Sequence, residues 1–94
     1  MKEGLWGLEM EQKVKVKLFS LYADAVNKSE VEVLLKQDGR VSELLYSLIR
    51  EYPALSKAFT VVKPIVLING VPASEDQLIT ESSEVAVVPP SAGG

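Results

Sequence analysis

The residues best suited to chemistry in this 94-residue chain are the last ones in the sequence, Val87-Val88-Pro89-Pro90-Ser91-Ala92-Gly93-Gly94. Glycine makes up about 7% of residues in average proteins, so a Gly-Gly ending arises by chance in roughly 0.5% of chains. The two prolines fix φ and favour an extended polyproline II segment. Because glycine has no side chain, nothing hinders attack at the carbonyl carbon of Gly94. The sequence predicts an extended tail, residues 89–94, whose reactive group is the terminal carboxylate.

Such a carboxylate suits activation by an ATP-using enzyme. Adenylation makes the carbonyl carbon electrophilic, and a sulfur or amine nucleophile then displaces AMP. The small side chains of Ser91 and Ala92 would allow a narrow channel of the partner enzyme to admit the tail. The carrier needs no acid or base of its own, since the activating partner is the one that uses ATP. The alternative is a disordered glycine-rich end, or an end created by truncation.

The chain contains no cysteine and no histidine. These absences exclude a disulfide, a thiol nucleophile, a thiolate zinc site and the common hydrolase triads that need an imidazole base. The carboxylates have no spacing that suggests a glycosidase or a metal site, and we expect surface positions for Asp24, Glu43, Glu75 and Asp76. We therefore expect a carrier or subunit role without catalysis by the chain alone, with no metal and no bound cofactor.

The charge of the chain is mildly acidic, with a formal net charge of −3 and an isoelectric point near 4.9. No basic stripe is present to neutralise a nucleic acid backbone, so nucleic acid is not an expected partner. The longest apolar runs have about four residues, far below the roughly 20 that cross a bilayer, and the acidic N-terminus does not resemble a signal peptide. We expect a cytoplasmic protein that does not bind membranes.

The elements that must position the tail follow from hydrophobic periodicity. Residues 13–19 and 30–35 alternate apolar and charged side chains, which predicts two half-buried strands whose lysine and glutamate rows face each other in a hairpin. Six apolar residues at helical spacing predict a helix ended by Pro53, and they are Val41, Leu44, Leu45, Leu48, Ile49 and Tyr52. The segment 54–59 adds a short helical turn with Leu55 and Phe59 over the core.

The second half of the chain reads mainly as strands. The apolar run 64–68 suits a strand covered on both sides, Asn69-Gly70 is a hairpin turn, and 71–72 begins a return strand that Pro72 cuts short. Leu78 and Ile79 are expected to plug the core, and residues 84–88 form the last strand. Residues 1–12 have no period and read as a flexible N-terminal leader before a single domain, 13–88.

The predicted order of elements indicates an α+β fold. One main helix can cover one face of a mixed sheet of about five strands, which is the arrangement of a ubiquitin-like, β-grasp roll. Phe19, Leu34 and Val88 are then expected on the sheet face away from the helix, where an exposed apolar patch would bind a partner. Lys13, Lys15 and Lys17 either steer an acidic partner or form a solvated strand face. Tyr22 and Tyr46 are expected at the rim of the core.

The element order, the length from Met10 onward and the ending Glu84 to Gly94 resemble the MoaD family, the small subunit of molybdopterin synthase. The resemblance covers about Lys13 to Gly94, and the Pro-Pro pair favours MoaD over the shorter thiamin sulfur carrier ThiS. Val87-Val88 stands where the family usually has two aromatic residues.

The resemblance implies a role for each residue of the tail. Gly94 would be adenylated by a MoeB-type, E1-like enzyme and converted to a thiocarboxylate. The tail would enter that enzyme and then a MoaE-type large subunit, through Pro89, Pro90, Ser91, Ala92 and Gly93. The thiocarboxylate sulfur would build the dithiolene of molybdopterin.

Three alternatives to that role stay open at this point. The chain could be a ubiquitin-like modifier joined through Gly94 to lysines of target proteins. It could also carry sulfur for another pathway, such as thiamin synthesis or tRNA thiolation. Finally, it could be an interaction module whose Gly-Gly ending is accidental.

Overall fold

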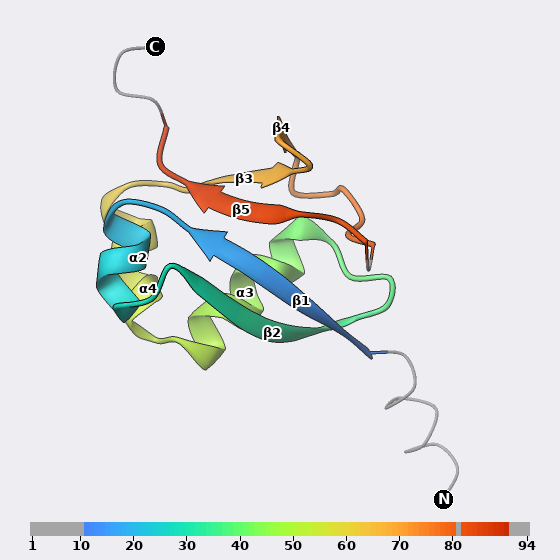
Figure 1. The fold of residues 1–94 in the computed structure, drawn as a ribbon, viewed down its shortest axis with the longest axis horizontal. Helices are drawn as coiled ribbons and strands as arrows, with labels where there is room; N and C mark the ends of the chain where they lie inside the picture. Colours follow the sequence, from blue (N-terminus) through green and yellow to red (C-terminus); the bar gives the residue numbers. More distant parts are fainter. Residues whose placement is uncertain (1–10, 81, 91–94) are drawn as a thin grey trace, which may run out of the picture.

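The computed structural model describes residues 11–80 and 82–90. Its elements are β1 (Glu11–Leu18), α2 (Leu21–Val26), β2 (Glu30–Lys36), α3 (Val41–Glu51), α4 (Ala54–Val61), β3 (Ile65–Ile68), β4 (Val71–Pro72) and β5 (Val85–Val88). The strands form one sheet in the order β2-β1-β5-β3-β4, in which β1 and β5 run parallel and the other pairs are antiparallel (Figure 1). This arrangement confirms the predicted ubiquitin-like, β-grasp fold.

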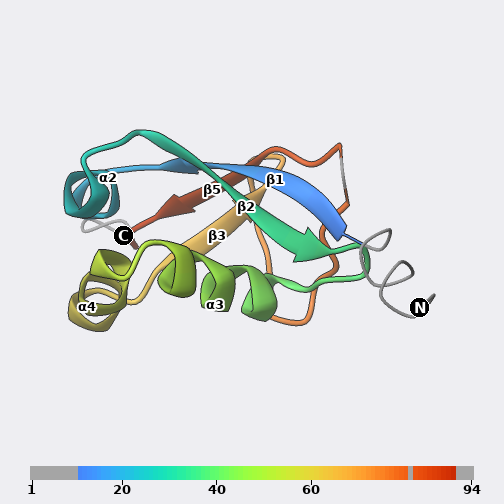
Figure 2. The same ribbon diagram turned by 90° about the horizontal axis from the view of Figure 1, so that it is seen from below.

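Helices α3 and α4 lie on one side of the sheet. Figure 2 shows α3 and α4 beneath it and α2 at the end that β1 and β5 point toward, while the opposite face carries no helix among residues 11–80 and 82–90. Alternate strand residues turn to the covered face and are buried, and the core consists of these together with helical and loop residues: Val14, Val16, Leu18, Tyr22, Val31, Val33, Leu35, Val41, Leu44, Leu48, Leu55, Ala58, Val66, Ile68, Ile79, Val85 and Val87.

The predicted hairpin and main helix are confirmed. Strands β1 and β2 pair with Lys15 opposite Glu32 and Lys17 opposite Glu30. Helix α3 buries the apolar stripe that was expected of it and ends just before Tyr52, whose N–H still donates to the carbonyl of Leu48. The Asn69-Gly70 turn has positive φ at both residues, 52° and 83°, as a type I′ hairpin turn requires.

The N-terminal boundary of the domain lies two residues earlier than predicted. Glu11 and Gln12 belong to β1, and Gln12 is only 3% exposed although it is polar. Its side-chain amide donates to the carbonyls of Lys36, Gln37 and Ile79, at 3.0, 3.3 and 3.0 Å. The amide N–H groups of Gln12 are thus satisfied, whereas its Oε1 is buried without a hydrogen-bond partner among the described residues. The rest of the predicted leader, residues 1–10, lies outside the described residues.

Four other expectations need correction. Residues 21–26 form helix α2, which the sequence did not indicate, and Tyr22 on that helix is fully buried, not at the rim. Strand β3 is covered on one side only, so Ile65 and Leu67 are half-buried on the open face. Of the two expected core plugs, Ile79 is buried but Leu78 is 49% exposed, since neighbouring residues of an extended segment point in opposite directions.

The described residues contain no helix long and apolar enough to cross a membrane. Within the same residues, no group of three or more acidic side chains is placed to hold a metal ion.

Candidate functional site

The C-terminal segment leaves the domain from the middle of the sheet. Strand β5 lies between β1 and β3, and its core-facing side chains, Val85 and Val87, are 3% and 0% exposed. The N–H of Phe19 donates to the carbonyl of Val87 at 3.3 Å, and Val88 lies opposite Ile65 of β3. The last strand is therefore paired on both edges, and the chain leaves the sheet at its central strand (Figure 1).

Pro89 and Pro90 end this pairing. Successive residues of a strand turn their N–H and C=O groups to opposite edges. Since the carbonyl of Val87 faces β1, where it accepts from Phe19, the backbone groups of residue 89 face β1 as well. Proline has no N–H to donate there, and the ladder stops. Pro89 is half-buried and Pro90 is exposed. Ser91, Ala92, Gly93 and Gly94, which the sequence singled out, lie outside the described residues.

Apolar side chains surround the point where the chain leaves the sheet, on the face without helices. Phe19 directly follows β1, Val88 ends β5 and Ile65 begins β3. The three strands are adjacent, and these three residues lie side by side. Ala86 and Leu67 form the next row. We call these five residues the outlet patch: Phe19, Ile65, Leu67, Ala86 and Val88. Phe19 is 48% exposed and the others are half-buried, so the patch offers a contiguous apolar surface beside the tail.

The structure brings together two of the three apolar residues that the sequence singled out for partner binding. Phe19 and Val88 belong to the outlet patch. Leu34 is 46% exposed on the same face, but it lies opposite Lys13, six residues before Phe19. At about 3.3 Å per residue this separates Leu34 from Phe19 by roughly 20 Å. Leu34 therefore belongs to a different surface.

Sequence reasoning missed the other members of the outlet patch. The run from 64 to 68 predicts that Ile65 and Leu67 are buried, because it is entirely apolar. All four residues of β3 are apolar, so the sequence does not show which of them face the core. The difference in burial between Ile65 and Leu67 on one face and Val66 and Ile68 on the other arises because helices cover only one side of the sheet.

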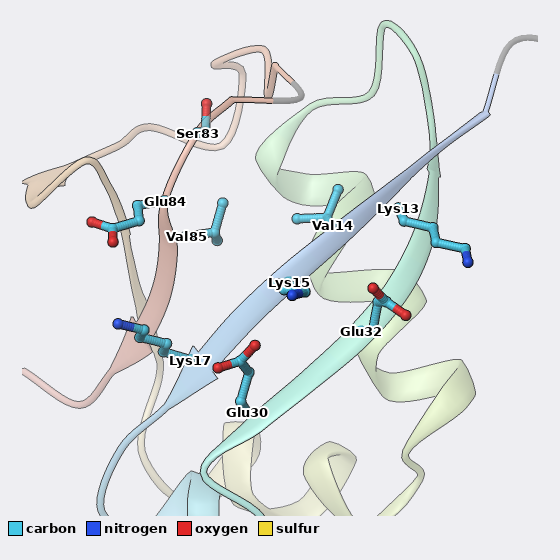
Figure 3. Close-up of a pocket in the computed structure, with 9 residues that line it drawn as sticks. All are labelled: Lys13, Val14, Lys15, Lys17, Glu30, Glu32, Ser83, Glu84 and Val85. Atoms are coloured by element: carbon cyan, nitrogen blue, oxygen red, sulfur yellow. The ribbon is translucent and has the colours of Figure 1, made fainter.

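The three lysines of β1 line an open groove between β1 and the start of β5 (Figure 3). The groove has a volume of about 370 Å³, and glutamates flank the lysine row on both sides, with Glu30 and Glu32 on β2 and Glu84 before β5. Because the acidic side chains match the lysines in number, the groove has no excess positive charge that would favour an anion. This arrangement supports a solvated strand face.

The turn that carries Phe19 is held by Tyr22. The hydroxyl of Tyr22 donates to the carbonyl of Val62 at 2.6 Å, and its ring meets that of Phe59 edge-on at 5.2 Å. The N–H of Tyr22 donates to the carbonyl of Phe19 at 3.1 Å, which closes a tight turn through Ser20. Burial raises the pKa of the Tyr22 hydroxyl above its ordinary value, so Tyr22 remains a neutral hydrogen-bond donor.

Comparison with known proteins supplies the family. The sequence profile of the ThiS family matches residues 16–94, which is most of the chain and includes Gly93 and Gly94. The chain belongs to the ThiS family. This membership agrees with the sequence resemblance at the level of the ubiquitin-like sulfur carriers, without separating MoaD from ThiS. Among curated proteins none matches the chain.

Solved structures resemble this ThiS-family chain over nearly its whole length. The crystal structure of SAMP1 from Haloferax volcanii is 28% identical with a TM-score of 0.74, over 87% of this chain and 99% of SAMP1. The small archaeal modifier protein 1 of Methanosarcina acetivorans is 26% identical, with a TM-score of 0.69, over 89% of this chain and 98% of its own. A putative molybdopterin converting factor, subunit 1, from Pyrococcus furiosus is 23% identical, with a TM-score of 0.72, over 85% and 99% of the two chains, and supports the fold alone.

Proposed function

We propose that this protein is the sulfur-carrier small subunit of a molybdopterin synthase. In this role, the Gly94 carboxylate is activated by an E1-like enzyme of the MoeB type and converted to a thiocarboxylate. The observation that carries the proposal is the outlet: a strand fixed at the centre of the sheet leads through two prolines into a Gly-Gly segment that the family match includes. The large subunit would be of the MoaE type.

The proposed chemistry takes place on a backbone carboxylate. The carboxylate oxygen attacks the α-phosphorus of ATP, which releases pyrophosphate and forms an acyl adenylate. A sulfur nucleophile attacks the acyl carbon, a carbon–sulfur bond forms, and AMP leaves. The thiocarboxylate sulfur then attacks a carbon of the molybdopterin precursor and displaces an oxygen substituent from that carbon. Water next cleaves the acyl carbon–sulfur bond, which leaves the sulfur on the precursor and restores the carboxylate. None of these steps needs a side-chain base from this chain, which has neither cysteine nor histidine.

The outlet patch supplies the contact surface for the activating enzyme and the large subunit in this proposal. Its apolar side chains lie next to the base of the tail, so docking would place Pro89 and the residues after it at the entrance of a partner's channel. Interfaces between proteins commonly draw most of their binding energy from a few residues, and aromatic anchors are prominent among them. Phe19 is the most exposed member of the patch and the candidate anchor.

An intact-mass measurement tests the carrier role. The protein is incubated with a MoeB-type enzyme, ATP and a sulfur source, and the expected product is heavier by the replacement of one oxygen by sulfur. A variant that lacks Gly94 is the matched control and should keep its mass. An unchanged mass for the full chain, when the same enzyme preparation modifies its own carrier, would overturn the proposal. Molybdopterin formed with a MoaE-type subunit then distinguishes this pathway from thiamin synthesis and tRNA thiolation.

A second candidate function is protein modification, and the similarity to SAMP1 structures supports it. The same acyl adenylate would lead to an amide between Gly94 and a lysine of a target, with loss of AMP. Expression of an N-terminally tagged chain, followed by denaturing blots and mass spectrometry of lysine adducts, tests this role. A ladder of tagged conjugates that disappears when Gly94 is deleted supports modification, whereas a single unconjugated band rejects it.

A further inference from the structure

Strand β2 is the exposed edge of the sheet on the side away from β3 and β4 (Figure 1). The N–H of Leu18 donates to the carbonyl of Ser29. In an antiparallel pair every second residue turns its N–H and C=O to the same neighbour, so the backbone groups of Val31 and Val33 also face β1. The residues that alternate with Ser29, Val31 and Val33 turn their backbone groups away from β1. Glu30, Glu32 and Leu34 thus present N–H and C=O groups to the free edge.

A groove of about 360 Å³ lies beside this edge, between β2 and α3. Leu35 and Ser47 are buried in its floor, whereas Leu34 and Tyr46 are 46% and 66% exposed at its sides. The guanidinium of Arg50 lies 5.7 Å from the centre of the Tyr46 ring and supports that ring in its exposed position. Free backbone groups beside a partly apolar groove are what an added strand requires.

The charges around the edge indicate what kind of strand would bind. Glu30 and Glu32 have Lys17 and Lys15 on one side, and on the other side no strand formed by residues 11–80 or 82–90. In the groove, Lys36 is paired with Glu43 at 3.4 Å, and acidic side chains outnumber basic ones. A second copy of the chain fits this edge poorly, because antiparallel pairing centred on Glu32 would place two Glu32 carboxylates opposite each other.

We propose that the β2 edge binds an extended segment of a protein partner, which pairs as an added strand. Its basic residues, at alternate positions, would lie over Glu30 and Glu32, and its intervening apolar residues would enter the groove against Leu35 and Tyr46. Strand β1 separates this edge from β5, so the outlet patch and the edge can be occupied together. This docking site is independent of the proposed function of Gly94.

The chain itself suggests a probe. Residues 13–18, Lys-Val-Lys-Val-Lys-Leu, already pair with the inner edge of β2. The acetylated and amidated hexapeptide of this sequence is titrated into the ¹⁵N-labelled protein. We expect saturable shifts at the amides of Glu30, Glu32 and Leu34. A peptide of the same sequence, N-methylated on its alternate pairing residues, keeps the charges but loses the backbone donors, and it should bind about tenfold more weakly.

Two protein variants refine the test. Glu32→Gln removes one carboxylate at the edge and should weaken binding about threefold, as expected for one cross-strand charge pair. Glu75→Gln removes an exposed carboxylate in the loop before β5 and should leave binding unchanged. The chain without Gly94 should bind the peptide as well as the full chain does, so this test cannot fail through a failure of the carrier role.

Three results would overturn the proposal. Equal binding of the N-methylated and parent peptides would show that charge attraction alone is responsible. Absence of saturable shifts would show that the edge does not accept a strand. Sedimentation of the free protein as a dimer whose contacts map to β2 would assign the edge to a second copy of the chain.

Discussion

At the level of single residues, Tyr22 has the clearest structural role near the outlet. Its hydroxyl bonds to the carbonyl of Val62, which joins α2 to the end of α4. We expect Tyr22→Phe to lower the free energy of unfolding by about 1–2 kcal/mol, because the carbonyl loses its partner while the ring stays in place. Urea unfolding measures the loss. Tyr46→Phe, at a hydroxyl on a 66% exposed side chain, should have no effect.

The difference in unfolding free energy between the wild type and Tyr22→Phe should depend on pH, because the pKa of Tyr22 is raised in the folded protein. In the unfolded chain the phenol ionises near its ordinary pKa of about 10, below its pKa in the folded protein. The contribution of the hydroxyl is therefore complete below about pH 10 and is lost as the pH rises through the folded pKa. The difference in unfolding free energy between the wild type and Tyr22→Phe should therefore stay constant up to about pH 9 and narrow as the pH rises above about 10. A difference that stays constant over the whole range would contradict the neutral, buried hydroxyl.

At the level of elements, the turn between β1 and α2 determines where Phe19 lies. Ser20 has φ 57° and ψ −132°, typical of the first central position of a type II′ turn, which favours glycine. Helix α2 has only six residues, too few for a helical period to stand out in the sequence. For this reason the sequence could not predict the burial of Tyr22, although the longer stripe on α3 was sufficient to predict that helix.

Because Ser20 occupies a position that favours glycine, we expect Ser20→Gly to raise the free energy of unfolding by about 1 kcal/mol. Ser29→Gly is the matched control, since Ser29 is also exposed and next to a strand but is not among the residues with positive φ. There glycine only adds freedom to the unfolded chain and should lower stability by about 0.5–1 kcal/mol. Urea unfolding of the two variants should therefore give shifts of opposite sign. A lower free energy of unfolding for Ser20→Gly would show that the backbone of Ser20 is not strained.

At the level of the whole molecule, local patterns and long-range register contributed differently to what could be predicted. Alternation at residues 13–19 and 30–35 predicted β1 and β2, and Asn69-Gly70 predicted its turn, because each signal is local. The outlet patch depends on the insertion of β5 between β1 and β3, which no local pattern encodes. The same register separates Leu34 from Phe19, although both are exposed apolar residues on one face.

Because the two surfaces are separate, each can be tested by replacing one exposed apolar side chain with alanine, and the two chosen side chains are similarly exposed. Phe19→Ala removes the most exposed member of the outlet patch, and we expect the KM of a MoeB-type enzyme for the protein to rise about tenfold, equivalent to about 1.4 kcal/mol of lost contact. Leu34→Ala should leave that KM unchanged but weaken binding of the Lys-Val peptide at the β2 edge. Both variants should unfold at nearly the wild-type urea concentration, since each side chain is about half exposed. Equal effects of the two variants on the KM would show that the enzyme contacts the whole open face and does not distinguish the patch from the edge.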